Sequence, residues 1–175
     1  RAIVNTDVAA STKMIEAGNE LKLVAENRGY QFYSFEEAVR FAGNEGTIKV
    51  VNDFELAEAW TVAAGQNITL DLNGKTLTQD GSVNDYLMLF KNDGTKASTI
   101  TIKNGTVNSA DIAIGNYGEL IVDGATISGD YAAIYNFYAD ANTYGKATLN
   151  GTVEGWILNC GELTVDGGIA QWIDN

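Results

Sequence analysis

The fold is decided by two nearly identical stretches of sequence, NYGELIVDG at residues 116–124 and NCGELTVDG at residues 159–167. Seven of the nine positions are the same, and the stretches begin 43 residues apart. Both contain an apolar-x-apolar segment followed directly by Asp-Gly. An internal repeat of this kind indicates an architecture in which similar units stack on one another.

The apolar-x-apolar segment followed by Asn-Gly or Asp-Gly recurs along the chain. Alternation with a period of two predicts strands, and Asn-Gly and Asp-Gly predict tight turns because these residues tolerate positive φ. The five units are residues 70–74, 100–105, 120–124, 147–151 and 163–167.

A second mark, an apolar residue followed by any residue and then asparagine, comes later in each unit. In stacked parallel strands, equivalent residues lie about 4.8 Å apart, so their amides can hydrogen-bond along a row. A meander of hairpins also uses Asn-Gly turns, but it gives no reason for asparagine at a fixed phase. We therefore predict an all-β parallel solenoid with one asparagine row: Asn92, Asn116, Asn136, Asn159 and Asn175.

A short helix is predicted ahead of the repeats. Ser34 and Glu37 form a capping box, which opens a helix over about residues 35–42 that Gly43 closes. This helix would cap the first turn of the solenoid, whose end would otherwise expose its core. We predict a repeat domain over residues 31–175 and an attachment or linking segment over residues 1–30, which lacks the repeat.

Three stretches carry a resemblance to a known fold family: YSFEEAV at 33–39, GTIKV at 46–50 and ITLDLNGKTLT at 68–78. They resemble right-handed parallel β-helix domains with the pectate-lyase-like fold, above all the non-catalytic repeats of bacterial surface proteins and of phage fibre or decoration proteins. The resemblance covers about residues 31–175. It implies a right-handed β-helix with a capping helix, an extracellular location, and self-association, with trimers as one form, or contact with neighbouring subunits.

Composition excludes several function classes. The 175 residues carry a net charge of −12 and contain no histidine, so neither a histidine base nor an imidazole metal ligand is available. An acidic chain repels nucleic acid. No apolar run approaches 18 residues, so we expect no membrane span.

Catalytic residues are not expected either. The fold family includes lyases and glycoside hydrolases, and glycoside cleavage needs two carboxylates at a set separation. The candidates Asp71, Asp123 and Asp166 fall in strand segments or turns, where a structural role is the simpler interpretation. We therefore predict a protein that is not an enzyme and has no cofactor and no metal.

Aromatic residues form the candidate binding site. They cluster over residues 130–145, where they could stack on sugar rings or bury a protein contact; alternatively, some face the core. The set is Tyr131, Tyr135, Phe137, Tyr138 and Tyr144. Downstream, Trp156 and Trp172 are expected to stack, and Cys160 is expected to be a buried, inert thiol.

The functional hypothesis is a non-catalytic structural or adhesive module of an extracellular surface or virion protein, acting through protein–protein assembly. The alternative is a carbohydrate-binding or polysaccharide-cleaving β-helix domain that uses the aromatic cluster. The acidic surface and the repeats without recognisable chemistry favour the first hypothesis.

Overall fold

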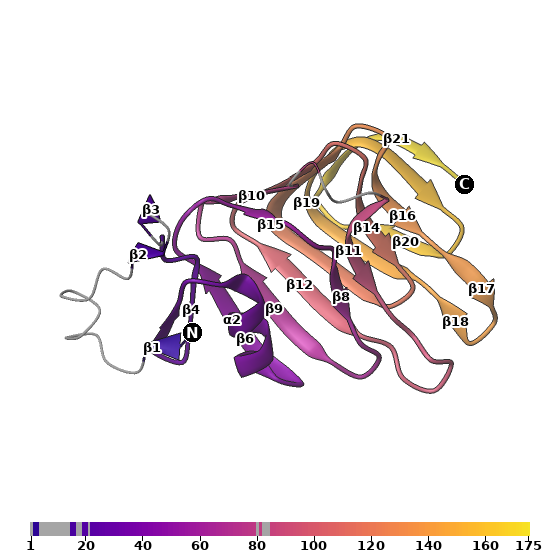
Figure 1. Ribbon diagram of the computed structural model, residues 1–175. Coiled ribbons are helices and arrows are strands. Elements are labelled where there is room, and N and C mark those ends of the chain that lie inside the picture. Colours follow the sequence, from indigo (N-terminus) through magenta and orange to yellow (C-terminus); the bar gives the residue numbers. More distant parts are fainter. Residues whose placement is uncertain (1, 4–14, 17–18, 21, 80, 82–84) are drawn as a thin grey trace.

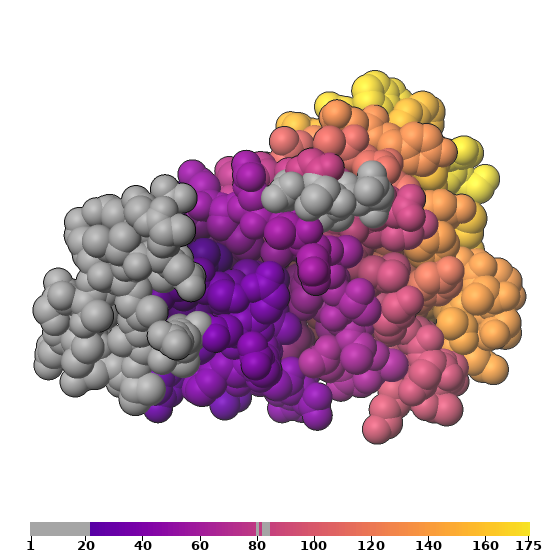
Figure 2. Space-filling model, in the orientation of Figure 1, coloured from indigo at the N-terminus to yellow at the C-terminus, as the bar shows by residue number. Residues whose placement is uncertain are grey.

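The computed structural model describes residues 2–3, 15–16, 19–20, 22–79, 81 and 85–175. These residues form strands and one helix, and most of the strands pair in parallel. The prediction of an all-β chain with mainly parallel strands is confirmed. Successive segments of the chain follow one another along the molecule from the N-terminal to the C-terminal end (Figures 1 and 2).

The helix α2 spans Phe35–Ala42, as the sequence predicts. The Ser34 side chain accepts a hydrogen bond from the backbone N–H of Glu37 at 3.4 Å, which satisfies one of the unpaired donors of the first turn. Phe35 and Ala38 are buried, and the Phe35 ring lies 5.2 Å from that of Trp60. The helix therefore covers the end of the core at which the parallel strands begin (Figure 1).

The first column of parallel strands carries the regular part of the sequence pattern. Each strand pairs in register with the next one of the column. Its members are β6 (Glu45–Val50), β9 (Asn67–Asp71), β12 (Thr99–Lys103), β15 (Glu119–Gly129), β19 (Lys146–Asn159) and β20 (Glu162–Val165). One inward row of fully buried side chains consists of Ile48, Leu70, Ile102, Val122 and Leu149.

Two further columns complete the parallel sheet. The second contains β7 (Phe54–Leu56), β10 (Thr76–Gln79), β13 (Thr106–Ser109), the end of β15, the middle of β19, and the start of β21 (Ile169–Asp174). The third contains β8 (Trp60–Val62), β11 (Tyr86–Phe90), β14 (Ile112–Asn116), β16 (Ala132–Asn136) and the ends of β19 and β21. From β6 onward the chain passes through the columns in the same order each time.

The antiparallel pairs lie at the N-terminal edge of the first column or outside the columns. Strand β4 (Ala25–Asn27) pairs with β5 (Tyr30–Phe32) and with β6, and β1 (Ala2–Ile3) pairs with β5. Residues 25–27, which the sequence analysis places in the linking segment of residues 1–30, thus belong to the main sheet. Much of residues 1–21 lies outside the described residues. Two small hairpins are β2 (Ile15–Glu16) with β3 (Asn19–Glu20), and β17 (Tyr138–Asp140) with β18 (Thr143–Tyr144).

The structure corrects the register of the first predicted unit. Ile102 pairs with Leu70 on one side and Val122 on the other, so residues 68–71 are equivalent to 120–123 and Asn73 lies beyond the phase assigned to it. The reason is a longer corner: four residues separate Asp71 from Thr76, whereas two separate Lys103 from Thr106. Because Leu72 is buried in that corner, the apolar alternation continues past the strand.

Candidate functional site

The asparagine row lies where the third column turns into the first. Asn116 Nδ2 donates to Asn136 Oδ1, Asn136 Nδ2 to Asn159 Oδ1, and Asn159 Nδ2 to Asn175 Oδ1, each at 2.8 Å. Asn116 and Asn136 are fully buried. Because a buried amide without partners is costly, these mutual bonds are what allow a row of amides beside the core.

The structure does not bring Asn92 into this row. Phe90 is the residue that pairs with Asn116, so the aromatic ring occupies the position expected for the amide. Asn92 lies two residues further on, where it bridges to Ala97 and its Oδ1 accepts the N–H of Gly94 at 2.8 Å. The apolar-x-Asn signal was misleading here because the asparagine belongs to an insertion after the strand.

A tightly packed glycine corner supports the row, and the sequence analysis missed it. A Cβ on Gly145 would collide with the backbone oxygen of Asn116 and with Oδ1 of Asn136, and a Cβ on Gly161 would collide with the backbone oxygen of Gly145. Asn136 also donates to the Glu162 carbonyl at 2.9 Å. For Gly161 the signal was present in the Asn-x-Gly-Glu motif, repeated at residues 116–119 and 159–162, in which glycine allows one corner to lie directly on the next. Gly145 lies outside this motif.

The predicted aromatic set divides into separate groups. The Phe137 ring is sandwiched between Tyr117, at 4.4 Å, and Tyr135, at 4.1 Å, and both pairs are stacked. Tyr86 meets the edge of the same ring at 5.7 Å. Because both faces of Phe137 are covered, Tyr135 and Phe137 form an internal stack instead of an open platform for a ligand.

The other aromatic residues of the set lie apart from this stack. Tyr138 and Tyr144 face each other across the β17–β18 hairpin, with ring centroids 6.3 Å apart. Tyr131 is 62% exposed and lines a shallow depression with Trp156, Leu158 and Asp174. Trp156 pairs in register with Trp172, and their rings lie 5.7 Å apart.

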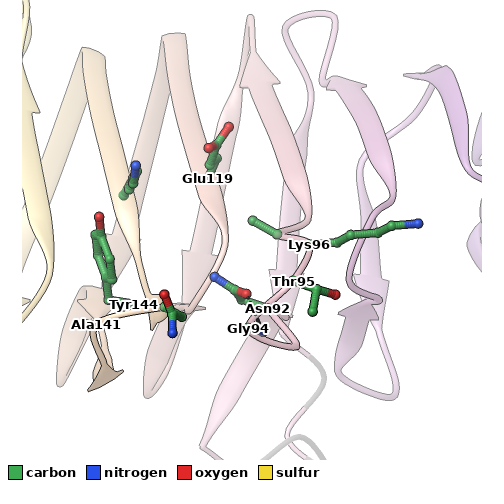
Figure 3. A pocket seen from close by; sticks show the side chains of 10 residues that line it. Asn92, Gly94, Thr95, Lys96, Glu119, Ala141 and Tyr144 are labelled. Carbon is green, nitrogen blue, oxygen red and sulfur yellow. Dashed lines mark hydrogen bonds between the residues drawn. The ribbon is translucent and has the colours of Figure 1, made fainter.

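A polar cleft of about 240 Å³ lies between the loop of residues 91–98 and the β17–β18 hairpin. Figure 3 shows Tyr144 on one side, Asn92 and Thr95 on the other, and Glu119 on the strand between them, while Lys96 extends away. The remaining lining residues are Gly94, Ala97, Ala141, Asn142 and Lys146. The cleft thus combines amides, a carboxylate, an ammonium group and an aromatic ring.

One wall of the cleft is fixed by charge. Tyr144 donates a hydrogen bond from its hydroxyl to Glu162 Oε1 at 2.9 Å, and Lys146 Nζ lies 3.8 Å from Glu162 Oε2 and 5.4 Å from the centre of the Tyr144 ring. The Glu162 carboxylate, followed by Tyr144, raises the pKa of Lys146. Lys146 therefore stays cationic throughout the neutral range.

The opposite wall is fixed by Asp93. Its Oδ1 accepts from the Thr95 hydroxyl at 2.6 Å, the Lys96 N–H at 2.7 Å and the Thr95 N–H at 2.8 Å. These bonds lower the pKa of Asp93 from 3.8 to about 2, with the Thr95 hydroxyl as the largest cause. At neutral pH the carboxylate is therefore charged and accepts three hydrogen bonds within the loop.

The expectation for Cys160 is wrong, because the thiol is exposed. Asn159 directs its amide into the row, so the next residue faces outward at the corner, as alternation along an extended chain requires. In the described part of the chain, no three His, Cys, Asp or Glu side chains lie so as to hold a metal ion. The described helix is not one that could cross a membrane.

Comparison with family models, curated proteins and solved structures finds no match to this chain.

Proposed function

We propose that the chain is a right-handed parallel β-helix that serves as a rigid, non-catalytic structural or adhesive module outside the cell or on a virion. It assembles with further copies of itself through the edge formed by β20 and β21. The proposal is supported by the fixed order in which the chain passes through its three strand columns. Crossover connections between parallel strands are right-handed in nearly all proteins, which supports the handedness, and the resemblance of residues 33–78 supports the location.

The exposed aliphatic side chains of β20 and β21 are the observation that carries the assembly proposal. Val165 continues the inward row of Leu149, and Ile173 continues that of Ile157. Yet Val165 is 45% exposed and Ile173 is 40% exposed, whereas Leu149 and Ile157 are fully buried.

A strand edge next to exposed aliphatic side chains favours pairing with another chain. Ile169 and Trp172, which are 64% and 53% exposed, add apolar surface on the outward side of β21, at the positions that pair with Thr152 and Trp156. The amide of Asn175, which accepts from Asn159, lies at the end of the asparagine row. A second copy supplies matching aliphatic side chains and amides, because both copies carry the same edge.

Sedimentation velocity over a wide concentration range tests this proposal. We expect the wild-type chain to form a defined oligomer, and Ile173→Lys and Val165→Lys to shift it to monomer because a buried, unpaired ammonium group opposes association. Ile121→Lys is the matched control, since Ile121 is 37% exposed on an outward position of β15, away from this edge.

Circular dichroism establishes that each variant keeps its β structure. A wild-type chain that stays monomeric at every concentration would overturn the assembly proposal. So would an oligomer that both edge variants leave intact or that Ile121→Lys disrupts equally.

A further inference from the structure

The polar cleft is formed by two insertions in the repeat, one at residues 91–98 and one at residues 137–145. The corner between the third and first columns takes two residues at 117–118, between β14 and β15. It takes eight residues at 91–98, before β12, and nine at 137–145, before β19. Because β12 and β19 are the two neighbours of β15, the insertions stand on either side of a short corner.

The strand spacing sets the width of this cleft. Strands β12 and β19 lie two spacings apart, which is roughly 9.5 Å. Glu119, the first residue of β15, lies between the insertions (Figure 3). Near their tips the insertions approach each other, since a Cβ on Gly94 would lie 3.4 Å from Oγ1 of Thr143. The cleft is therefore about as wide as one small ring-shaped ligand.

Both walls are held in place before any ligand binds. The Asp93 carboxylate bonds to Thr95 and Lys96 in one insertion. In the other, Asp140 Oδ1 accepts the N–H of Asn142 at 2.8 Å. A site with fixed walls loses little conformational entropy on binding, which favours weak polar ligands that a mobile loop would not retain.

The lining selects a ligand that both donates and accepts hydrogen bonds. Asn92, Asn142 and Lys146 supply N–H donors, and Glu119 supplies a carboxylate acceptor. An anion is disfavoured because Glu119 and Glu162 lie beside the ammonium group of Lys146, in a chain of net charge −12. The other lysine of the lining, Lys96, extends away from the cleft (Figure 3). An apolar ligand is disfavoured because Ala97 and Ala141 are the only aliphatic side chains of the lining.

We propose that this cleft binds a neutral hexose unit of a glycan. Neighbouring hydroxyl groups of such a sugar donate to the Glu119 carboxylate and accept from the amides of Asn92 and Asn142. The site differs from the aromatic stack of Tyr135 and Phe137, whose ring faces cover one another. None of its lining residues belongs to β20 or β21, although Glu162 at the start of β20 holds Tyr144 and Lys146 in place. The carbohydrate-binding alternative is thus assigned to the polar cleft.

Saturation-transfer difference NMR on the full chain tests the proposal, with glucose, galactose, mannose and their disaccharides as probes. We expect transfer to at least one neutral sugar, and calorimetry then gives its dissociation constant. Glu119→Gln removes a charge-assisted hydrogen bond and should weaken binding about tenfold or more. Asn142→Ala should weaken it several-fold.

Glu154→Gln and Asn108→Ala are matched controls, because both residues are exposed on outward positions of the second column, whereas the cleft lies at the corner between the third column and the first. Both should bind as the wild type does, and so should the edge variant Ile173→Lys if assembly is independent of the site. Absence of transfer to every neutral probe would overturn the proposal. Equal losses in the cleft and control variants, or transfer only to glucuronic or sialic acid, would also overturn it.

Discussion

Asn116 donates an amide hydrogen bond to Asn136 at 2.8 Å, although the residues are 20 positions apart and both are fully buried. Each amide also donates to a backbone carbonyl of another strand: Asn116 Nδ2 to that of Lys146 at 3.1 Å and Asn136 Nδ2 to that of Glu162 at 2.9 Å. Asn116 Oδ1 accepts the N–H of Gly118, in its own corner, at 3.0 Å. The row therefore links side chains and corners of successive strands in one buried network.

Replacing Asn136 should destabilise the protein strongly. Asn136→Ala removes its bonds to Asn116, Asn159 and the Glu162 carbonyl, and leaves buried partners unsatisfied. The free energy of unfolding should fall by about 3 kcal/mol, as measured by urea denaturation. Asn108→Ala, at an exposed position of β13, should change it by less than about 0.5 kcal/mol. Equal effects of the two changes would contradict a stabilising role for the row.

The glycine corner should not tolerate even one methyl group. In Gly145→Ala, the new Cβ meets the backbone oxygen of Asn116 and the amide of Asn136, so the corner must shift. We expect a loss of about 2–3 kcal/mol and a lower melting temperature in scanning calorimetry. Gly81→Ala, where a Cβ meets nothing within 4 Å, should leave the melting temperature within a few degrees of the wild type. A Gly145→Ala variant as stable as Gly81→Ala would show that the corner can relax.

The inward row of the first column should account for much of the stability. Ile102 is fully buried between Leu70 and Val122, and Ile102→Ala should destabilise by about 2–5 kcal/mol. Ile121 is partly exposed on the outward side of the next strand, so Ile121→Ala should cost less than about 1 kcal/mol. The denaturant midpoints of the two variants compare the inward and outward sides of the first column. Similar shifts of the midpoint would show that burial does not distinguish Ile102 from Ile121.

Asp93 should titrate well below an ordinary carboxyl group. Its folded pKa of about 2 lies below the ordinary 3.8, so its stabilising effect on the loop is complete above pH 3.8 and disappears as the pH falls through 2. Carboxyl chemical shifts followed by NMR should give this midpoint. Thr95→Val removes the hydroxyl hydrogen bond that lowers the pKa of Asp93 most, so it should raise that pKa toward 3.8. Thr61→Val, on β8, should leave the pKa of Asp93 unchanged. A wild-type midpoint near 3.8 would contradict the hydrogen bonds to Asp93.

The sequence by itself determined the strands, the capping helix and the recurrence of Asn116, Asn136 and Asn159, because alternation, capping residues and repeats are local patterns. Tertiary structure alone decided which residues meet. Corner lengths vary, so the first unit was misaligned by two residues, and Asn92 fell in an insertion instead of the row. The cleft between residues 91–98 and 137–145 could not be read from the sequence, because it depends on which strands lie side by side. Periodicity records the direction of each side chain relative to its own strand, whereas register between strands is fixed by core packing across the whole chain.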